Sequence, residues 1–181
     1  MSLHGPGLWY ATRATGLVTL LLLTASVLLG VLTAGRFASP KWPRFLTQGL
    51  HRNVSLLVLV FLAVHVITTV IDTYTSISPA AAFIPFASSY KAGWLSLGAV
   101  ALDLLLALTL TSVARNRLGY RSWRSVHWLA YACWPVALAH GLGIGTDRRT
   151  TWVFALTVGC VASVVVAAAW RLVSAARLAV R

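Results

Sequence analysis

The sequence predicts an all-α membrane protein, a bundle of five transmembrane helices with its N-terminus outside and its C-terminus inside. Hydrophobic residues make up 59% of the 181-residue chain and charged residues only 10%, whereas soluble domains are about 45–50% apolar and about 25% charged. Mean hydropathy is +0.81. This composition excludes a disordered, collagen-like or coiled-coil chain and an ordinary soluble enzyme. We expect a single membrane domain over residues 1–181.

Five apolar windows are long enough to cross a bilayer, since a helical span needs about 20 residues and a helix satisfies its own backbone in lipid. The first window is similar to a signal peptide, but its apolar run exceeds the roughly 7–15 residues of such a peptide and most nearby basic residues follow it. We therefore expect it to be the first span. The expected helices cover about 9–34, 51–72, 92–114, 123–145 and 150–171.

Basic residues divide unequally between the two sides of these helices. Eleven of the 15 Lys and Arg residues lie on the side of the C-terminus, and short cytoplasmic loops carry such an excess, so this side should be inside. A net charge of +12 would indicate nucleic acid for a soluble domain. Here the charges occupy short gaps between apolar runs, so we expect membrane lipid as a partner and no nucleic acid.

Four histidines in or beside the expected helices are the main candidates for chemistry, because ionisable groups within a span are costly. His51 and His65 share one face of the second helix, about 21 Å apart along its axis. His127 and His140 are about 19.5 Å apart on the fourth helix. Because the two helices run in the same direction, His51 and His127 should share an inner level, and His65 and His140 an outer level. Each level suits one haem held between two imidazoles.

The angle between His127 and His140 is the difficulty, since 13 residues of a straight helix leave them about 140° apart. Pro135 lies between them and cannot donate to the carbonyl of Tyr131, so we expect a bend or local rewinding there. Interhelical hydrogen bonds would also explain single histidines, notably His51 at a membrane edge. Zinc is disfavoured, because the pairs lie far apart and no Cys or carboxylate completes a tetrahedral set.

The histidine spacings and one sequence stretch resemble the ferric reductase-like transmembrane domain family. This family includes ferric reductases, NADPH oxidases and the haem subunit of a bacterial methionine-sulfoxide reductase system. The stretch YRSWRSVHWLAYACWPVALAHGLGIGTD, residues 120–147, is similar to the family's fourth-helix signature, in which W-R-x-x-H precedes an aromatic-rich turn and a second His. The resemblance covers about residues 9–171.

The resemblance implies transmembrane electron transfer through two bis-histidine haem b groups, the inner bound by His51 and His127 and the outer by His65 and His140. Electrons would pass from a cytoplasmic flavin or other donor to ferric iron, oxygen, quinone or a redox protein outside. The chain has five expected spans rather than six and no FAD or NAD(P)H domain. We therefore expect flavin only on a partner, a cytoplasmic flavoprotein or dehydrogenase. An oxidoreductase subunit of a bacterial cytoplasmic membrane is expected; whether it is catalytic alone stays open.

Three arginines and two aromatic residues complete the candidate cofactor site. Arg13, in the stretch TRATG, is similar to a family position that faces a haem propionate, and guanidinium pairs well with carboxylate. Arg52 and Arg124, beside the inner histidines, are candidates for the inner propionates. All three could instead anchor helix ends at the headgroups. Trp128 and Tyr131 are expected to line the haem space, although packing aromatics would give the same pattern.

Other functions stay open at this point. Asp103 lies near the middle of the third helix, where it could relay protons or bond to a neighbouring helix. A small transporter or channel with a histidine proton relay is the alternative to a haem protein. A cytochrome subunit that exchanges electrons with quinone is a third possibility.

The charge asymmetry generates a topology prediction. A reporter protein fused after Arg181 should be active on the cytoplasmic side, and one inserted near Asp147 on the outer side, because the inner loops carry most of the basic residues. Reporter activity and protease access on intact cells would measure this. The opposite pattern would mean that the expected direction of electron flow is reversed.

Overall fold

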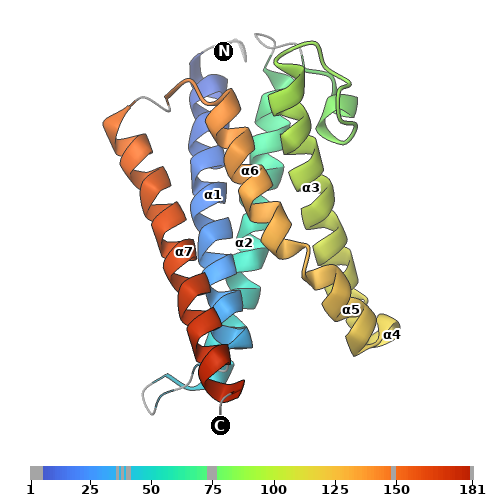
Figure 1. The fold of residues 1–181 in the computed structure, drawn as a ribbon. Coiled ribbons are helices and arrows are strands. Elements are labelled where there is room, and N and C mark those ends of the chain that lie inside the picture. Colours follow the sequence, from blue (N-terminus) through green and yellow to red (C-terminus); the bar gives the residue numbers. More distant parts are fainter. Residues whose placement is uncertain are drawn as a thin grey trace. The chain divides into compact units, whose positions relative to one another are not determined.

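The computed structural model describes residues 6–35, 37, 39, 42–72, 77–147 and 150–179. Most of these residues are helical, and within the ranges given the only bridge-type pairing outside helices joins Ser39 and Trp42. Figure 1 shows the helices in chain order. The elements are α1 (Pro6–Ala34), α2 (Arg44–Ile71), the 3-10 helix η1 (Pro79–Ala82), α3 (Ala92–Val113), α4 (Arg115–Leu118), α5 (Tyr120–His127), α6 (Ala130–Ile144) and α7 (Thr151–Ala179).

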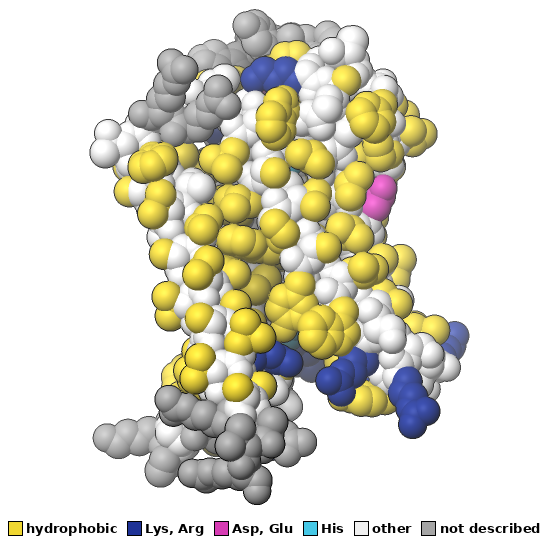
Figure 2. Space-filling view, in the orientation of Figure 1, with side chains coloured by type: hydrophobic (Ala, Val, Ile, Leu, Met, Phe, Trp, Pro, Cys, Tyr) yellow, Lys and Arg dark blue, Asp and Glu magenta, His cyan; other side chains and the backbone are white. Residues whose placement is uncertain are grey.

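Among the described residues, four helices are long and apolar enough to cross a membrane: α1, α2, α3 and α7. Their outer faces expose large apolar side chains, including Leu110 at 66%, Val113 at 81% and Val166 at 67% exposed. Such faces suit lipid rather than water. Figure 2 shows apolar side chains over much of the visible face, with Lys and Arg gathered at the α4–α5 end. The all-helical membrane class is confirmed, whereas the five-span count and the orientation of the termini stay predictions.

The fourth expected helix, 123–145, is two helical segments rather than one. α5 ends at His127 and α6 begins at Ala130. The N–H groups of Leu129 and Ala132 bond to carbonyls three residues before them, those of Val126 and Leu129. A 3-10 turn advances about 120° per residue instead of about 100°. The tighter turns therefore reduce the angle between His127 and His140 around the helix axis. This is the change that the expected rewinding would produce.

Pro135 does not itself divide the segment, because it lies inside α6. The tightened turns come before it, and their bonds begin at the level of Val126. The expected rewinding is therefore present, but its centre is upstream of the proline.

The described chain forms two compact units, and α1 and α2 contribute to both. The first unit contains residues up to 17 and residues 62–145. In this unit α3 packs along α6 (Figure 1) and also contacts α5 and η1. Buried Ala99 and Ala101 on α3 and Cys133 on α6 give this contact small side chains, which let membrane helices approach closely. The Sγ of Cys133 lies 3.5 Å from the carbonyl oxygen of Ala101.

The connector between α2 and α3 folds onto the first unit through η1. Ile77 and Ala81 are buried, while Phe86 is 75% exposed. Phe86 has a left-handed φ of 64°, which is strained for an aromatic residue. Its N–H donates to Ser96 Oγ at 2.7 Å, and this bond holds the turn on the first part of α3.

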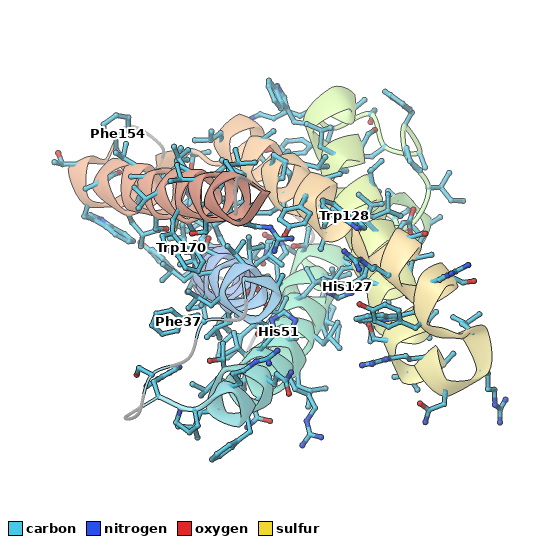
Figure 3. The ribbon with its side chains drawn as sticks, turned by 60° about the horizontal axis from the view of Figure 1, so that its bottom comes forward. Phe37, His51, His127, Trp128, Phe154 and Trp170 are labelled. Carbon is cyan, nitrogen blue, oxygen red and sulfur yellow. The ribbon has the colours of Figure 1, made fainter. Side chains whose placement is uncertain are left out.

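The second unit contains residues 18–61 and 146 onward. Val31, Val58 and Thr47 are almost fully buried in it. Trp170 of α7 contacts the position of Gly35, and its ring lies 6.3 Å from that of Phe37 in an edge-on arrangement, as Figure 3 shows. The Trp170 ring therefore packs α7 against the segment that follows α1.

Candidate functional site

The two expected outer ligands, His65 of α2 and His140 of α6, lie in the same compact unit. His65 Nδ1 is 2.8 Å from the carbonyl oxygen of Thr12, and His140 Nδ1 is 2.8 Å from the carbonyl oxygen of Trp94. Both histidines therefore belong to one unit, and their pairing as ligands of an outer haem stays a prediction.

The hydrogen bonds also assign the tautomer of these rings. A carbonyl oxygen only accepts, so Nδ1 must carry the proton that it donates. In a singly protonated imidazole, Nε2 then keeps its lone pair and is the nitrogen able to bind a metal ion. Metal-binding histidines commonly donate their other ring N–H to a backbone carbonyl in this way.

His51 has the same arrangement in the other compact unit. Its Nδ1 donates to the carbonyl oxygen of Ser26 at 2.9 Å. Ser26 Oγ is also 3.5 Å from this nitrogen and 2.8 Å from the hydroxyl of Ser55. Because α2 begins at Arg44, His51 lies two helical turns inside the helix rather than at its end. With Nδ1 donating, Nε2 is the nitrogen that carries the lone pair in the neutral ring.

His127 is positioned by an aromatic ring. It ends α5 (Figure 3) and stacks on Trp123, with ring centroids 4.9 Å apart and an interplanar angle of 28°. Trp123 in turn donates its indole N–H to Ser112 Oγ at 3.2 Å, and the guanidinium of Arg115 lies 4.5 Å from its ring centroid. His127 and His51 belong to different units, so the inner pair stays a prediction.

The three candidate arginines occupy different surroundings. Arg13 is partly buried, and its guanidinium lies 4.4 Å from the ring centroid of Trp9. Arg52 and Arg124 are exposed, and Arg124 lies 3.4 Å from the hydroxyl of Tyr120. Cation–π contact holds an arginine while leaving guanidinium N–H groups able to donate. Their propionate-binding roles stay predictions.

The expected aromatic lining lies at the break between α5 and α6. Trp128 is 53% and Tyr131 is 43% exposed, and their ring centroids are 5.3 Å apart. These rings are therefore not core packing residues of their unit. Asp103 is also exposed on α3. Within the described ranges, no three His, Cys, Asp or Glu side chains cluster as one metal site, and a bis-histidine haem needs only two side-chain ligands.

Some functional neighbours were not predicted from the sequence. They are the carbonyl groups of Thr12, Ser26 and Trp94, and the ring of Trp123. A main-chain acceptor has no residue identity, so composition and spacing cannot find it. Trp123 stands in the W-R-x-x-H stretch four residues before His127, and this spacing places the two rings on one face of a helix.

The fold and the histidines define a class: an all-helical membrane protein with imidazoles held between helices through Nδ1. Residues 15–138 match the model of the family described as ferric reductase like transmembrane component. The match covers more than half of the chain, so the chain belongs to this family, which is generally haem-binding. It is an integral, multi-pass membrane protein. No curated protein and no solved structure shows a significant match.

The family match includes His51, His65 and His127 and ends two residues before His140. The match range does not test the ligand role of any of the four histidines, which stay predictions. His140, outside the range, has the same type of Nδ1 bond as His65 and His51.

The stacking on Trp123 generates a testable prediction. Trp123→Leu should loosen His127, since an aromatic pair contributes about 0.5–1.5 kcal/mol beyond its buried area. We expect a lower content of inner haem with the outer haem retained, measured by haem absorbance per chain. Trp152→Leu, at a half-exposed tryptophan of α7, is the matched control. An unchanged haem spectrum in Trp123→Leu would show that the stacking does not position a ligand.

Proposed function

We propose that this protein carries electrons across the membrane through two haem b groups, each bound by two histidines. The observation that carries this proposal is the Nδ1 hydrogen bonding of His51, His65 and His140 to backbone carbonyls, because this is the tautomer in which metal-binding histidines are commonly held. Family membership supports it independently. Bound haem would supply a one-electron couple between ferric and ferrous iron.

The proposed pairing follows the inner and outer levels that the histidine spacing predicts. His65 and His140 are proposed as the outer pair, and their presence in one compact unit supports this assignment. His51 and His127 are proposed as the inner pair on the strength of the spacing. In both pairs the imidazole ring is held either by the hydrogen bond from Nδ1 or, for His127, by stacking on Trp123. The orientation of each proposed iron ligand would therefore be fixed before haem binds.

The remaining candidates would bind the haem propionates or cover a haem face. Arg13 is proposed to hold an outer propionate, and Arg52 and Arg124 inner ones, because guanidinium groups form strong, directional bonds with carboxylates. Trp128 and Tyr131 are proposed to cover a haem face. Their exposure in this structure supports that role, since each has a ring surface that its own unit does not cover.

The direction of electron flow is proposed from cytoplasm to outside. A cytoplasmic flavoprotein or dehydrogenase would supply electrons, and ferric iron, oxygen, quinone or a redox protein would accept them. The chain would then be the haem-carrying subunit of an oxidoreductase in a bacterial cytoplasmic membrane. The basic inner side that the sequence predicts supports this orientation.

Stoichiometry tests the proposal most directly. Purified protein should contain two haem b groups per chain by pyridine haemochrome assay, because two histidine pairs occupy two levels. Reduction by dithionite should shift the Soret band and reveal an α-band. A ratio of one would contradict the two-level assignment. A colourless, fully folded preparation from haem-replete cells would exclude haem and favour a histidine proton relay.

Single substitutions test the pairing. His65→Ala and His140→Ala should each lose about half of the haem and keep the inner group, because each iron has its own ligand pair. His51→Ala and His127→Ala should lose the inner group instead. All four variants should fail to reduce an impermeant acceptor outside. Spectra and haem content of purified variants measure this.

The control is His4→Ala, which changes a histidine before the first expected span. It should keep both haem groups and the transmembrane reduction. If His65→Ala kept both haem groups with an unchanged low-spin spectrum, His65 would not be a ligand and the proposed pairing would be wrong.

A further inference from the structure

Each histidine that bonds a backbone carbonyl also lies beside a glycine of the accepting helix. In every case the glycine follows the acceptor residue by four positions. The imidazole therefore contacts two successive turns of its neighbour, the carbonyl of one turn and the bare backbone of the next. The acceptor and glycine are Thr12 and Gly16 for His65, Ser26 and Gly30 for His51, and Trp94 and Gly98 for His140.

Helix geometry explains the interval of four. The carbonyl of residue i points along the axis toward residue i+4, whose N–H it accepts. It keeps a second lone pair, but the side chain at i+4 lies on the same face and limits access from outside. A glycine at i+4 removes this obstruction. A ring from another helix can then reach the carbonyl while its edge rests where a Cβ would be.

The three contacts differ in how closely the ring fills that space. A Cβ at position 98 would lie 2.6 Å from His140 Cε1 and 2.7 Å from its Nδ1. At position 16 it would lie 3.0 Å from His65 Cε1, and at position 30 it would lie 3.4 Å from His51 Cε1. The first distance is impossible without movement, the second is tight and the third is ordinary van der Waals contact.

Among the other glycines of the described helices, several face open space, and Gly143 is crowded by the Trp94 ring rather than by an imidazole. A Cβ built at Gly93, Gly141 or Gly159 would meet nothing within 4 Å. Gly35 is crowded, but by the ring of Trp170 at 2.8 Å rather than by an imidazole. The chain thus provides natural comparisons for both open space and crowding without a histidine.

We propose that Gly98, Gly16 and Gly30 are positioning residues that open a main-chain carbonyl to the Nδ1–H of a proposed haem ligand. For its effect on haem this inference rests on the proposed function, whereas the placement of the rings does not. A stronger Nδ1–H···O=C bond makes imidazole a better electron donor to iron. The glycines therefore help to keep the ferric state favoured and the reduction potential low.

Alanine substitutions of graded severity test this. Gly98→Ala should raise the midpoint potential of the outer haem and change its ferric EPR g-values, because the His140 ring must move away from the Trp94 carbonyl. Gly16→Ala should change the potential and g-values of the outer haem less, because its Cβ would crowd the His65 ring less closely. Gly30→Ala should leave the outer haem unchanged and shift the inner haem least of all. Redox titration and EPR of the purified full chain give both readouts.

Two controls separate positioning from packing. Gly159→Ala adds a methyl group in open space, and Gly35→Ala adds a conflict with Trp170 of nearly the size at position 98. Neither should move the outer potential, even if Gly35→Ala lowers thermal stability. If Gly35→Ala shifted the outer haem as much as Gly98→Ala, general packing would explain the effect and the proposal would fall.

The remaining outcomes each support or overturn the proposal. Gly98→Ala with wild-type potential and g-values overturns the proposal. If Gly98→Ala loses the outer haem while Gly35→Ala keeps it, the proposal is supported. If both variants fail to fold, Gly16→Ala decides, and a wild-type spectrum there overturns it.

A wild-type protein without haem would refute the proposed function and leave the glycine inference testable on its own. In that protein, ¹⁵N NMR of labelled histidine should show the Nδ1-protonated tautomer for His140 and its weakening in Gly98→Ala. A wild-type Nε2-protonated tautomer would overturn the inference even where haem is bound.

Discussion

The structure depends on imidazole N–H groups that donate to main-chain carbonyls of neighbouring helices. In hydrocarbon no water can satisfy such a donor, so an unpaired N–H would be costly. A helix carbonyl already accepts one bond but keeps a second lone pair. These bonds join α1 to α2 through Thr12 and His65, and α3 to α6 through Trp94 and His140. The same contacts therefore fix helix register and ligand direction.

Much of the helical fold is predictable because apolar length is the main requirement for crossing a membrane. The sequence predicts 92–114 for α3, which spans Ala92–Val113. It does not predict the break before Ala130, because the tightened turns arise from local hydrogen bonds upstream of the proline. Nor does it predict that α2 begins at Arg44, since 44–50 mixes polar and apolar residues and has no continuous apolar run.

The residues of the candidate site likewise divide into those that the sequence predicts and those that it does not. Histidine spacing predicts the four candidate ligands because ionisable side chains within apolar spans stand out in a sequence. Their supporting acceptors are invisible to a pattern search, since any residue offers a carbonyl. Gly98 is the one sequence signal beside His140 that could have been noticed. Glycine is common in membrane helices for packing alone, so the signal acquires meaning only when the ring is seen against it.

Support by main-chain atoms has an evolutionary consequence. At Thr12 and Trp94 the hydrogen bond to the imidazole is accepted by the carbonyl, whereas at Ser26 the side-chain Oγ also lies 3.5 Å from His51 Nδ1. Mutational drift at Thr12 and Trp94 can therefore preserve the bond, provided that the helix persists and the residue four places later stays small. A spacing of four between acceptor and glycine, rather than the identity of the acceptor residue, would then be the trait under selection.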